Sequence, residues 1–289
     1  MTVLVTGASG FIGRKLITRL EQEGHEVLTL TRQSGDIRLQ ETWAPLADRQ
    51  IDHVFHLASH SNIQESWTQI PEYLDNIVVG ISRALELCRA TRASLTYLSS
   101  FVYGVPAYLP IDEEHPKATA NPYSLAKKMG EEVCAFYAKE FSVRSTVLRP
   151  FVIYGPEQKE SFLIPTIIRQ VLEQPQVEVN DLTPRKRDYL YIDDLIDAMI
   201  HSMSPKELCG VYNIGYGTSF TIQELIDMVQ EEAGTRKPVS SRNIVRPNDY
   251  PDVIADISKA GKELGWKPRT DIKEGIRKTM QAYYAKKQN

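Results

Sequence analysis

A tyrosine and a lysine four residues apart could together exchange a proton with a bound molecule. Tyr123 and Lys127 lie in a stretch with helical periodicity, and residues at i and i+4 share one face of a helix. A free phenol has a pKa of about 10, and a neighbouring ammonium stabilises its phenolate form. The tyrosine could therefore take up and release a proton near neutral pH. Tyr283 and Lys287 repeat the spacing in a basic tail with no strand or serine before them, so we interpret that copy as chance.

Two serines stand upstream of this pair, at the end of an apolar run. The run 95–99 predicts a buried strand, and Ser99 and Ser100 lie at its end. A serine hydroxyl in this place could hydrogen-bond a substrate oxygen while the tyrosine transfers the proton. The residue types alone do not choose between the two serines.

A glycine-rich loop near the N-terminus has the pattern of a dinucleotide-binding turn. It follows the apolar run 2–5, opens the predicted helix 11–23, and consists of Gly7-Ala8-Ser9-Gly10-Phe11-Ile12-Gly13. Glycine is needed where the chain turns sharply, where backbone approaches a pyrophosphate, and where the helix packs on the strand. The helix N-terminus offers N–H groups and partial positive charge to phosphates. We expect a nicotinamide dinucleotide here, and its positive ring would further favour the phenolate.

The end of the second predicted strand, 26–30, should meet the adenosine ribose of that dinucleotide. An acidic residue there would bind the 2′-hydroxyl of NAD, whereas a basic residue suits the 2′-phosphate of NADP. The strand tip has no acid but is followed by Arg32, whose charge is fixed. The alternative interpretation is a solvated loop arginine. Arg32 thus favours NADP(H), with NAD(H) as the second choice.

Short apolar runs alternate with amphipathic stretches along the first half of the chain. This pattern predicts an α/β fold of the Rossmann type, with a doubly wound, mostly parallel sheet. The expected strands are 2–5, 26–30, 53–57, 95–99 and 145–148. The expected helices are 11–23, 77–90 and 123–141. The segment 31–50 is too polar and too short for a full helix, so that crossover should be abbreviated.

The chain changes character after residue 150, where prolines recur and the alternation weakens. We expect a smaller C-terminal substrate domain in addition to the dinucleotide-binding one. Residues 1–153 and 186–217 are assigned to the dinucleotide-binding Rossmann domain. Residues 154–185 and 218–289 are assigned to the smaller domain.

Composition excludes several classes of function. The net charge of −3 over 289 residues gives no basic footprint of a nucleic-acid partner. No apolar run approaches the roughly 20 residues that a membrane span needs, and the first residues have no basic start like that of a signal peptide. The three cysteines match no metal spacing. We expect a cytoplasmic protein without a metal.

Taken together, the motifs resemble those of the extended short-chain dehydrogenase/reductases, also called the NAD-dependent epimerase/dehydratase family. The resemblance extends from residue 6 to residue 260 in family order. Besides the glycine loop and Asn121-Pro122-Tyr123 with Lys127, it rests on His56-Leu57-Ala58, Asn76-Ile77-Val78-Val79-Gly80, Val102-Tyr103-Gly104, Arg149-Pro150, Tyr154-Gly155-Pro156, Arg187-Asp188-Tyr189 and Ala255-Asp256-Ile257-Ser258-Lys259-Ala260. It implies a Rossmann domain, a smaller nucleotide-sugar domain and a nucleotide-diphosphate sugar as substrate.

The resemblance also implies roles for single residues. The family's catalytic serine or threonine stands four residues before the tyrosine of Val-Tyr-Gly, which selects Ser99; if the loop is one residue short, Ser100 takes the role. His56 is more often a packed strand-end residue than a reactive one. Three residues match positions that hold the nucleotide: Arg187, Arg246 and Asp249. The implied cofactor contacts are Gly7, Ser9, Gly10, Phe11, Ile12, Gly13, Arg32, Asp36, Ile37, Leu57, Ala58, Asn76, Tyr123, Lys127 and Pro150.

One residue reduces the number of reactions that the resemblance allows. The 4,6-dehydratases of the family carry Thr-Asp-Glu before Val-Tyr-Gly, whereas Phe101 stands in the place of the glutamate here and cannot exchange a proton. Arg32 and the short crossover favour a reductase of 4-keto sugars that uses NADPH. The alternative is a 4-epimerase that retains NAD. A non-catalytic NADP-binding sensor or scaffold is disfavoured, because such proteins typically lack Tyr123 or Lys127.

Two further expectations concern partners. In this family the helices equivalent to 77–90 and 123–141 form a four-helix interface, so we expect a homodimer. The family often has asparagine in the segment before Tyr-Gly-Pro, where Phe151-Val152-Ile153 stands. This departure leaves the nucleotide and the sugar open.

Overall fold

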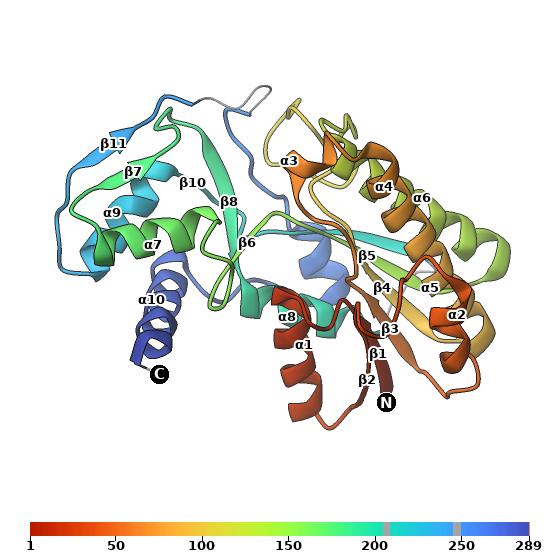
Figure 1. Ribbon diagram of the computed structural model, residues 1–289. Helices are drawn as coiled ribbons and strands as arrows, with labels where there is room; N and C mark the ends of the chain where they lie inside the picture. The colour runs from red at the N-terminus through yellow and green to blue at the C-terminus, as the bar shows by residue number, and fades with distance from the viewer. Residues whose placement is uncertain (205–208, 245–249, 289) are drawn as a thin grey trace.

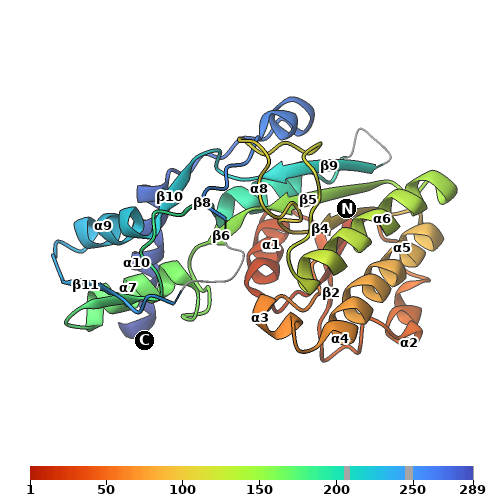
Figure 2. The ribbon, with the colours of Figure 1, turned by 90° about the horizontal axis from the view of Figure 1, so that it is seen from above.

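The computed structural model describes residues 1–204, 209–244 and 250–288 (Figure 1). A large parallel sheet carries helices on both faces, and a smaller group of strands and helices lies beside it (Figures 1 and 2). Among the helices of these residues, none combines the length and the apolar character that crossing a membrane requires.

The large sheet has six strands, and all neighbouring strands run parallel. Their order across the sheet is β2-β1-β3-β4-β5-β9. The strands are β1 (Thr2–Thr6), β2 (Glu26–Leu30), β3 (His53–His56), β4 (Ser94–Leu98), β5 (Ser145–Pro150) and β9 (Cys209–Ile214). The five strands expected from the apolar runs and the doubly wound α/β fold are thereby confirmed.

Alternation of apolar side chains along the strands explains why both faces are covered. In β1, Val3 and Val5 enter one core, whereas Leu4 enters the other. The first core also contains α1 (Phe11–Gln22) and α8 (Ile192–His201), and the second contains α5 (Gly80–Thr91) and α6 (Pro122–Phe141). The three predicted helices are confirmed, although α5 begins only at Gly80, after the π-helical stretch Asp75–Val79.

The connection from β2 to β3, which the structure describes throughout, contains no full-length helix, as its polar composition predicts. It holds the four-residue helix α2 (Gln40–Trp43) and a 3₁₀ turn. The buried Trp43 anchors it, and its indole N–H donates to the Ile37 carbonyl at 2.7 Å. Because β2 and β3 lie on opposite sides of β1, the chain reverses direction across the sheet there. In open α/β sheets the crevice at such a point, outside the carboxyl ends of the strands, binds ligands.

The smaller group contains a three-stranded sheet, β10-β8-β6, and a two-stranded sheet, β11-β7. Its strands are β6 (Val152–Tyr154), β7 (Val177–Val179), β8 (Lys186–Tyr191), β10 (Ser219–Thr221) and β11 (Val239–Ser241). The helices beside them are α7 (Leu163–Glu173), α9 (Ile222–Glu232) and α10 (Ile272–Gln288). The short helices α3 (Ile63–Ser66) and α4 (Ile70–Leu74) belong to the large group (Figure 1).

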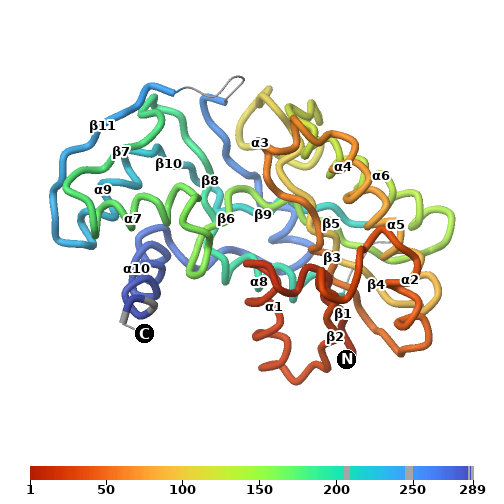
Figure 3. Tube along the Cα trace, viewed as in Figure 1, coloured from red at the N-terminus to blue at the C-terminus, as the bar shows by residue number. Residues whose placement is uncertain are grey.

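A buried carboxylate joins the two groups at β8. Asp188 accepts the backbone N–H groups of Tyr216, Gly217 and Ala255 at 2.6–3.1 Å. Figure 3 shows the chain after residue 250 passing between the groups, where Ala255 makes a parallel bridge to Ile111. Helix α8 and strand β9 lie with the large sheet. The domain boundaries drawn from the sequence stay a prediction.

Candidate active site

The glycine loop makes a tight turn at the carboxyl end of β1. Gly7 has a φ of +70°, and its N–H donates to the Leu30 carbonyl at 3.0 Å. A Cβ at Gly7 would lie 2.8 Å from the backbone nitrogen of Ala58, and a Cβ at Gly13 would overlap the Gly7 carbonyl. No side chain caps the start of α1 after Gly10, so its first N–H groups are left without a side-chain acceptor and can bind an anion. This cradle fits a dinucleotide pyrophosphate.

A threonine holds the ends of β1 and β3 together at this crevice. The Thr6 hydroxyl accepts the N–H groups of Leu57 and Ala58 at 3.2 and 3.1 Å, and lies 3.1 Å from Nδ1 of His56. Burial lowers the pKa of His56 to about 3, so its imidazole is neutral. These contacts give His56 a packing role and fix the backbone of Leu57 and Ala58 beside Gly7. The Asn76 amide oxygen accepts the backbone N–H of His60 at 3.0 Å.

The residues expected around the adenosine are divided between loop and core. Arg32 is exposed, and nothing within the described residues pairs with its guanidinium. Asp36 is bound by Arg38 through Nη2–Oδ2 at 2.6 Å, and this hydrogen bond lowers the pKa of Asp36. Ile37 is buried against Gly80. The sequence did not single out Arg38, which also reaches Glu72 at 3.0 Å.

The tyrosine and the lysine stand at the start of α6. Asn121 caps this helix by accepting the Ser124 N–H at 2.8 Å, which fixes the turn that carries Tyr123. Lys127 is buried, and its Nζ donates to the Leu98 carbonyl at 2.8 Å. Nζ lies 5.9 Å from the centre of the Tyr123 ring. The predicted pair therefore shares one helix face, next to the end of β4.

Burial governs the protonation of both groups. It lowers the pKa of Lys127 to about 7, and the Glu131 carboxylate opposes that shift. Burial raises the pKa of Tyr123, and a side-chain hydrogen bond with Ser100 lowers it. A lysine that titrates near neutrality beside a phenol can sustain proton exchange.

The two serines point to different partners. The Ser99 hydroxyl is buried and donates to Oε1 of Glu131 at 2.6 Å. The Ser100 side chain instead lies near the phenol of Tyr123 and lowers its pKa. Ser99 thus faces the protein interior, and Ser100 faces the reactive tyrosine. Pro150, the last residue of β5, is also buried.

Aromatic side chains, one of which follows the end of β4, pack next to the arginine expected to hold the nucleotide. The Phe101 ring centre lies 5.5 Å from that of Phe151 and 5.6 Å from that of Tyr250. The Arg187 guanidinium lies 5.6 Å from the Tyr250 ring centre and donates to the Tyr250 carbonyl at 2.8 Å. The other two residues expected at the nucleotide, Arg246 and Asp249, lie outside the described residues. Within 1–204, 209–244 and 250–288, no three histidine, cysteine or acidic side chains form a metal cluster.

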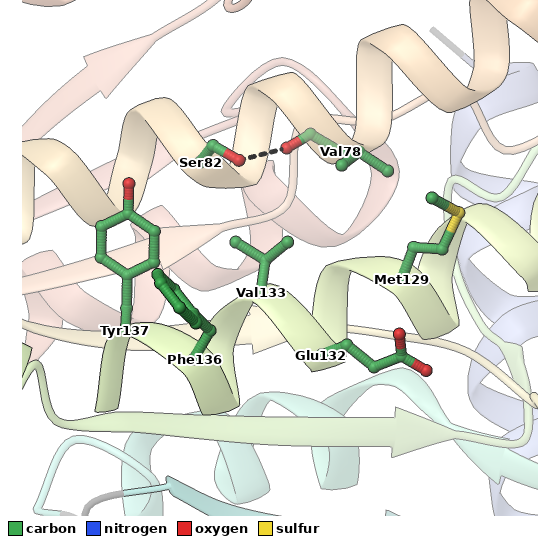
Figure 4. Close-up of a pocket in the computed structure, with 7 residues that line it drawn as sticks. All are labelled: Val78, Ser82, Met129, Glu132, Val133, Phe136 and Tyr137. Atoms are coloured by element: carbon green, nitrogen blue, oxygen red, sulfur yellow. Dashed lines mark hydrogen bonds between the residues drawn. The ribbon is translucent and has the colours of Figure 1, made fainter. Parts of the chain in front are cut away.

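Helices α5 and α6 present a groove on their outer face (Figure 4). From α6, Val133, Phe136 and Tyr137 line it together with Met129 and Glu132. Opposite them are Ser82 and Val78, joined by a 2.7 Å hydrogen bond. Phe136 is 54% exposed, which is high for a large apolar side chain.

Comparison with known proteins finds relatives along the whole chain. The sequence model of the NAD dependent epimerase/dehydratase family matches residues 3–215. The UDP-glucose 4-epimerase of Lactobacillus helveticus is 30% identical over 93% of this chain and 92% of that protein. Among solved structures, MoeE5 in complex with UDP-glucuronic acid and NAD is 29% identical, with a TM-score of 0.89 over 99% of this chain and 100% of that one. RMD from Pseudomonas aeruginosa complexed with NADPH is 28% identical, with a TM-score of 0.91 over 99% of both chains.

Proposed function

Because the chain belongs to the NAD-dependent epimerase/dehydratase family, we propose that it is a nucleotide-sugar 4-epimerase with retained NAD, with Ser100, Tyr123 and Lys127 as catalytic residues. The observation that carries the proposal is that Tyr123 and Lys127 share one face of α6 beside the end of β4, with Nζ of Lys127 5.9 Å from the centre of the Tyr123 ring. The Ser100 side chain lies near enough to this tyrosine to lower its pKa. The neighbouring Phe101 has no proton to exchange, which disfavours dehydration. The similarity to the UDP-glucose 4-epimerase of Lactobacillus helveticus supports epimerisation over the reductase reaction that Arg32 favours.

The residues would act as one proton-transfer unit. When bound, the dinucleotide supplies a two-electron acceptor and donor at its nicotinamide. Tyr123, as phenolate, removes the proton of the sugar 4-hydroxyl while that carbon is oxidised, and returns it when the ketone is reduced on the opposite face. Protonated Lys127 stabilises the phenolate. Ser100 donates a hydrogen bond to the reacting oxygen.

A reductase is the second candidate, and one observation favours it. Arg32 is exposed at the tip of β2 with no partner among the described residues, so its fork could bind a 2′-phosphate. The similar RMD structure contains NADPH. A reductase must release its dinucleotide at every turnover, whereas an epimerase regenerates it within each cycle. Cofactor exchange therefore separates the two functions.

The purified protein should contain tightly bound NAD and interconvert the 4-epimers of a UDP-hexose without added dinucleotide. NAD content is measured by chromatography after denaturation, and the sugars by NMR. Arg32→Ala serves as the matched variant and should leave both unchanged. The contrary outcome is that the protein oxidises NADPH with a 4-keto nucleotide sugar and that Arg32→Ala weakens its affinity for NADPH by roughly 10- to 150-fold. That outcome would establish the reductase.

We also propose that the groove of α5 and α6 is the interface of a homodimer. Phe136→Glu would place a charge on the exposed apolar face of α6 and should raise the dimer dissociation constant by at least about 30-fold. Light scattering at micromolar concentration measures the mass. Phe162→Glu is the control, because Phe162 is 50% exposed but precedes α7. A monomeric wild type, or an unaffected Phe136→Glu dimer, would refute this interface.

A further inference from the structure

A buried ion pair lies directly behind the catalytic residues. Arg149 on β5 binds Glu131 on α6 through both carboxylate oxygens, with Nε–Oε1 at 2.9 Å and Nη2–Oε2 at 2.6 Å. Oε1 also accepts the Ser99 hydroxyl at 2.6 Å. All three side chains are buried. An ion pair in this environment needs its remaining hydrogen-bonding capacity satisfied.

The other side of Arg149 meets that need and extends the network. Its Nη1 donates to the Tyr103 hydroxyl at 2.8 Å, and that hydroxyl donates to the Asn213 amide oxygen at 2.5 Å. The Asn213 N–H in turn donates to Glu113 at 2.7 Å. The guanidinium is thus held on one side by Glu131 and on the other by Tyr103. Arg149 therefore acts as a fixed anchor for Glu131.

Glu131 acts on the catalytic residues in two ways. It lies one helical turn after Lys127, so its charge is close to the ammonium. It also binds Ser99, which immediately precedes Ser100. The same strand end accepts the Lys127 ammonium at the Leu98 carbonyl. The segment that presents Ser100 to the phenol is therefore fixed from two directions.

We propose that Glu131 is a positioning residue for this proton exchange: anchored by Arg149, it fixes the strand end through Ser99 and places a carboxylate one helical turn from the Lys127 ammonium. The inference rests on the proposed catalytic role of Tyr123 and Lys127. It assigns the buried network a part in the reaction, beyond holding α6 to the sheet.

The groups that face Lys127 determine the sign of the expected pH effect. On α6 these are Glu131 and Tyr123, on β4 the Tyr97 ring at 5.0 Å and the Leu98 carbonyl, and on β3 the neutral His56. Burial lowers the pKa of Lys127 to about 7, and Glu131 is the charge that raises it. Removing the carboxylate should lower the pKa further. Lys127 would then lose its proton at lower pH and cease to stabilise the phenolate.

The test compares pH profiles of kcat and kcat/KM for Glu131→Gln and the wild type. The basic limb should move to lower pH by about one unit, which is about tenfold in rate at a fixed basic pH. KM for the nucleotide sugar should change less than about threefold, since Glu131 touches no substrate. Glu140→Gln, exposed on the same helix, is the matched control and should keep the wild-type profile.

A second variant keeps the proposal testable if Glu131→Gln fails to fold with Arg149 unpaired. Glu131→Gln combined with Arg149→Met removes both charges, which leaves no buried ion alone. The same shift of the basic limb is expected. A wild-type profile in either folded variant, or a loss equal at every pH, would overturn the inference.

A readout independent of the sugar separates this inference from the proposed function. The ionisation of Tyr123 can be followed by ultraviolet difference spectra of tyrosinate, with Tyr123→Phe as the blank. Glu131→Gln should raise the apparent pKa of that tyrosine, because the charge of Lys127 is lost. If the wild type has no epimerase activity but this shift occurs, the proposed function fails and the positioning role stands. If the wild type is active and no shift occurs, the positioning role fails alone.

Discussion

Replacing Tyr123 by phenylalanine should reduce turnover by roughly 10²- to 10⁴-fold, the usual loss for one acid–base group. Only the phenolic hydroxyl is removed and the ring stays, so packing at the start of α6 should persist. The Tyr123 ring lies beside the Lys127 ammonium, with Nζ 5.9 Å from the ring centre, and its hydroxyl is the proton acceptor of the proposed oxidation. The assay is interconversion of UDP-sugar 4-epimers by the purified variant. NAD content and melting temperature should match the wild type.

A second buried tyrosine provides the control for this result. Tyr212→Phe also removes one hydroxyl, which bonds Glu263 at 3.0 Å, and should leave turnover within about threefold of wild type. Ser100→Ala should share the loss seen with Tyr123→Phe, since Ser100 is the serine proposed to hydrogen-bond the reacting oxygen. Activity of Tyr123→Phe near the wild-type level would remove the tyrosine from the mechanism and with it the catalytic assignment.

The elements and motifs that sequence predicts well are those encoded locally. The strands and the helices show their periodicity within a dozen residues, and the glycine loop and the Tyr123/Lys127 pair each lie on one continuous segment. The six-stranded parallel sheet confirms the predicted strands and the fold class. Only the boundaries differ, because a π-helical stretch replaces the first turn expected before Gly80.

The partners of side chains could not be predicted in the same way. Glu131 has the sequence context of a helix-surface charge, and only the docking of α6 on β5 brings it to Arg149. Counting along the family motif selects Ser99, yet the Ser99 hydroxyl is bound to Glu131, and Ser100 is the serine that lowers the pKa of Tyr123. The one sequence signal for the role of Glu131 is its place one helical turn after Lys127. Its meaning depends on burial, which a single sequence does not encode.

The choice between reductase and epimerase could not be predicted for a similar reason, because it depends on what Arg32 contacts. Arg32 is a strong local signal for a 2′-phosphate, but an exposed arginine costs nothing to keep on a loop. The structure leaves that side chain at the surface, and it pairs the nearby Asp36 with Arg38 instead. The named 4-epimerase relative favours the reaction that the loop arginine disfavours. Arg246 and Asp249 lie outside the described residues and stay predictions.

Alanine at Gly13 should weaken dinucleotide binding by roughly 5- to 150-fold, because overpacking of this kind costs about 1–3 kcal/mol. A Cβ at this position would overlap the Gly7 carbonyl oxygen and lie 2.9 Å from the Ala8 Cα. Both are backbone atoms of the loop, so neither can rotate away. Helix α1 would have to move from β1, and its first N–H groups would leave the phosphates. NAD content and affinity, measured by chromatography and fluorescence titration, report the loss.

Gly261→Ala is the control, since a Cβ at Gly261 would have its nearest neighbour at 3.5 Å and Gly261 has no positive φ. Wild-type NAD content in Gly13→Ala would show that the close packing of α1 on the loop is not what holds the dinucleotide.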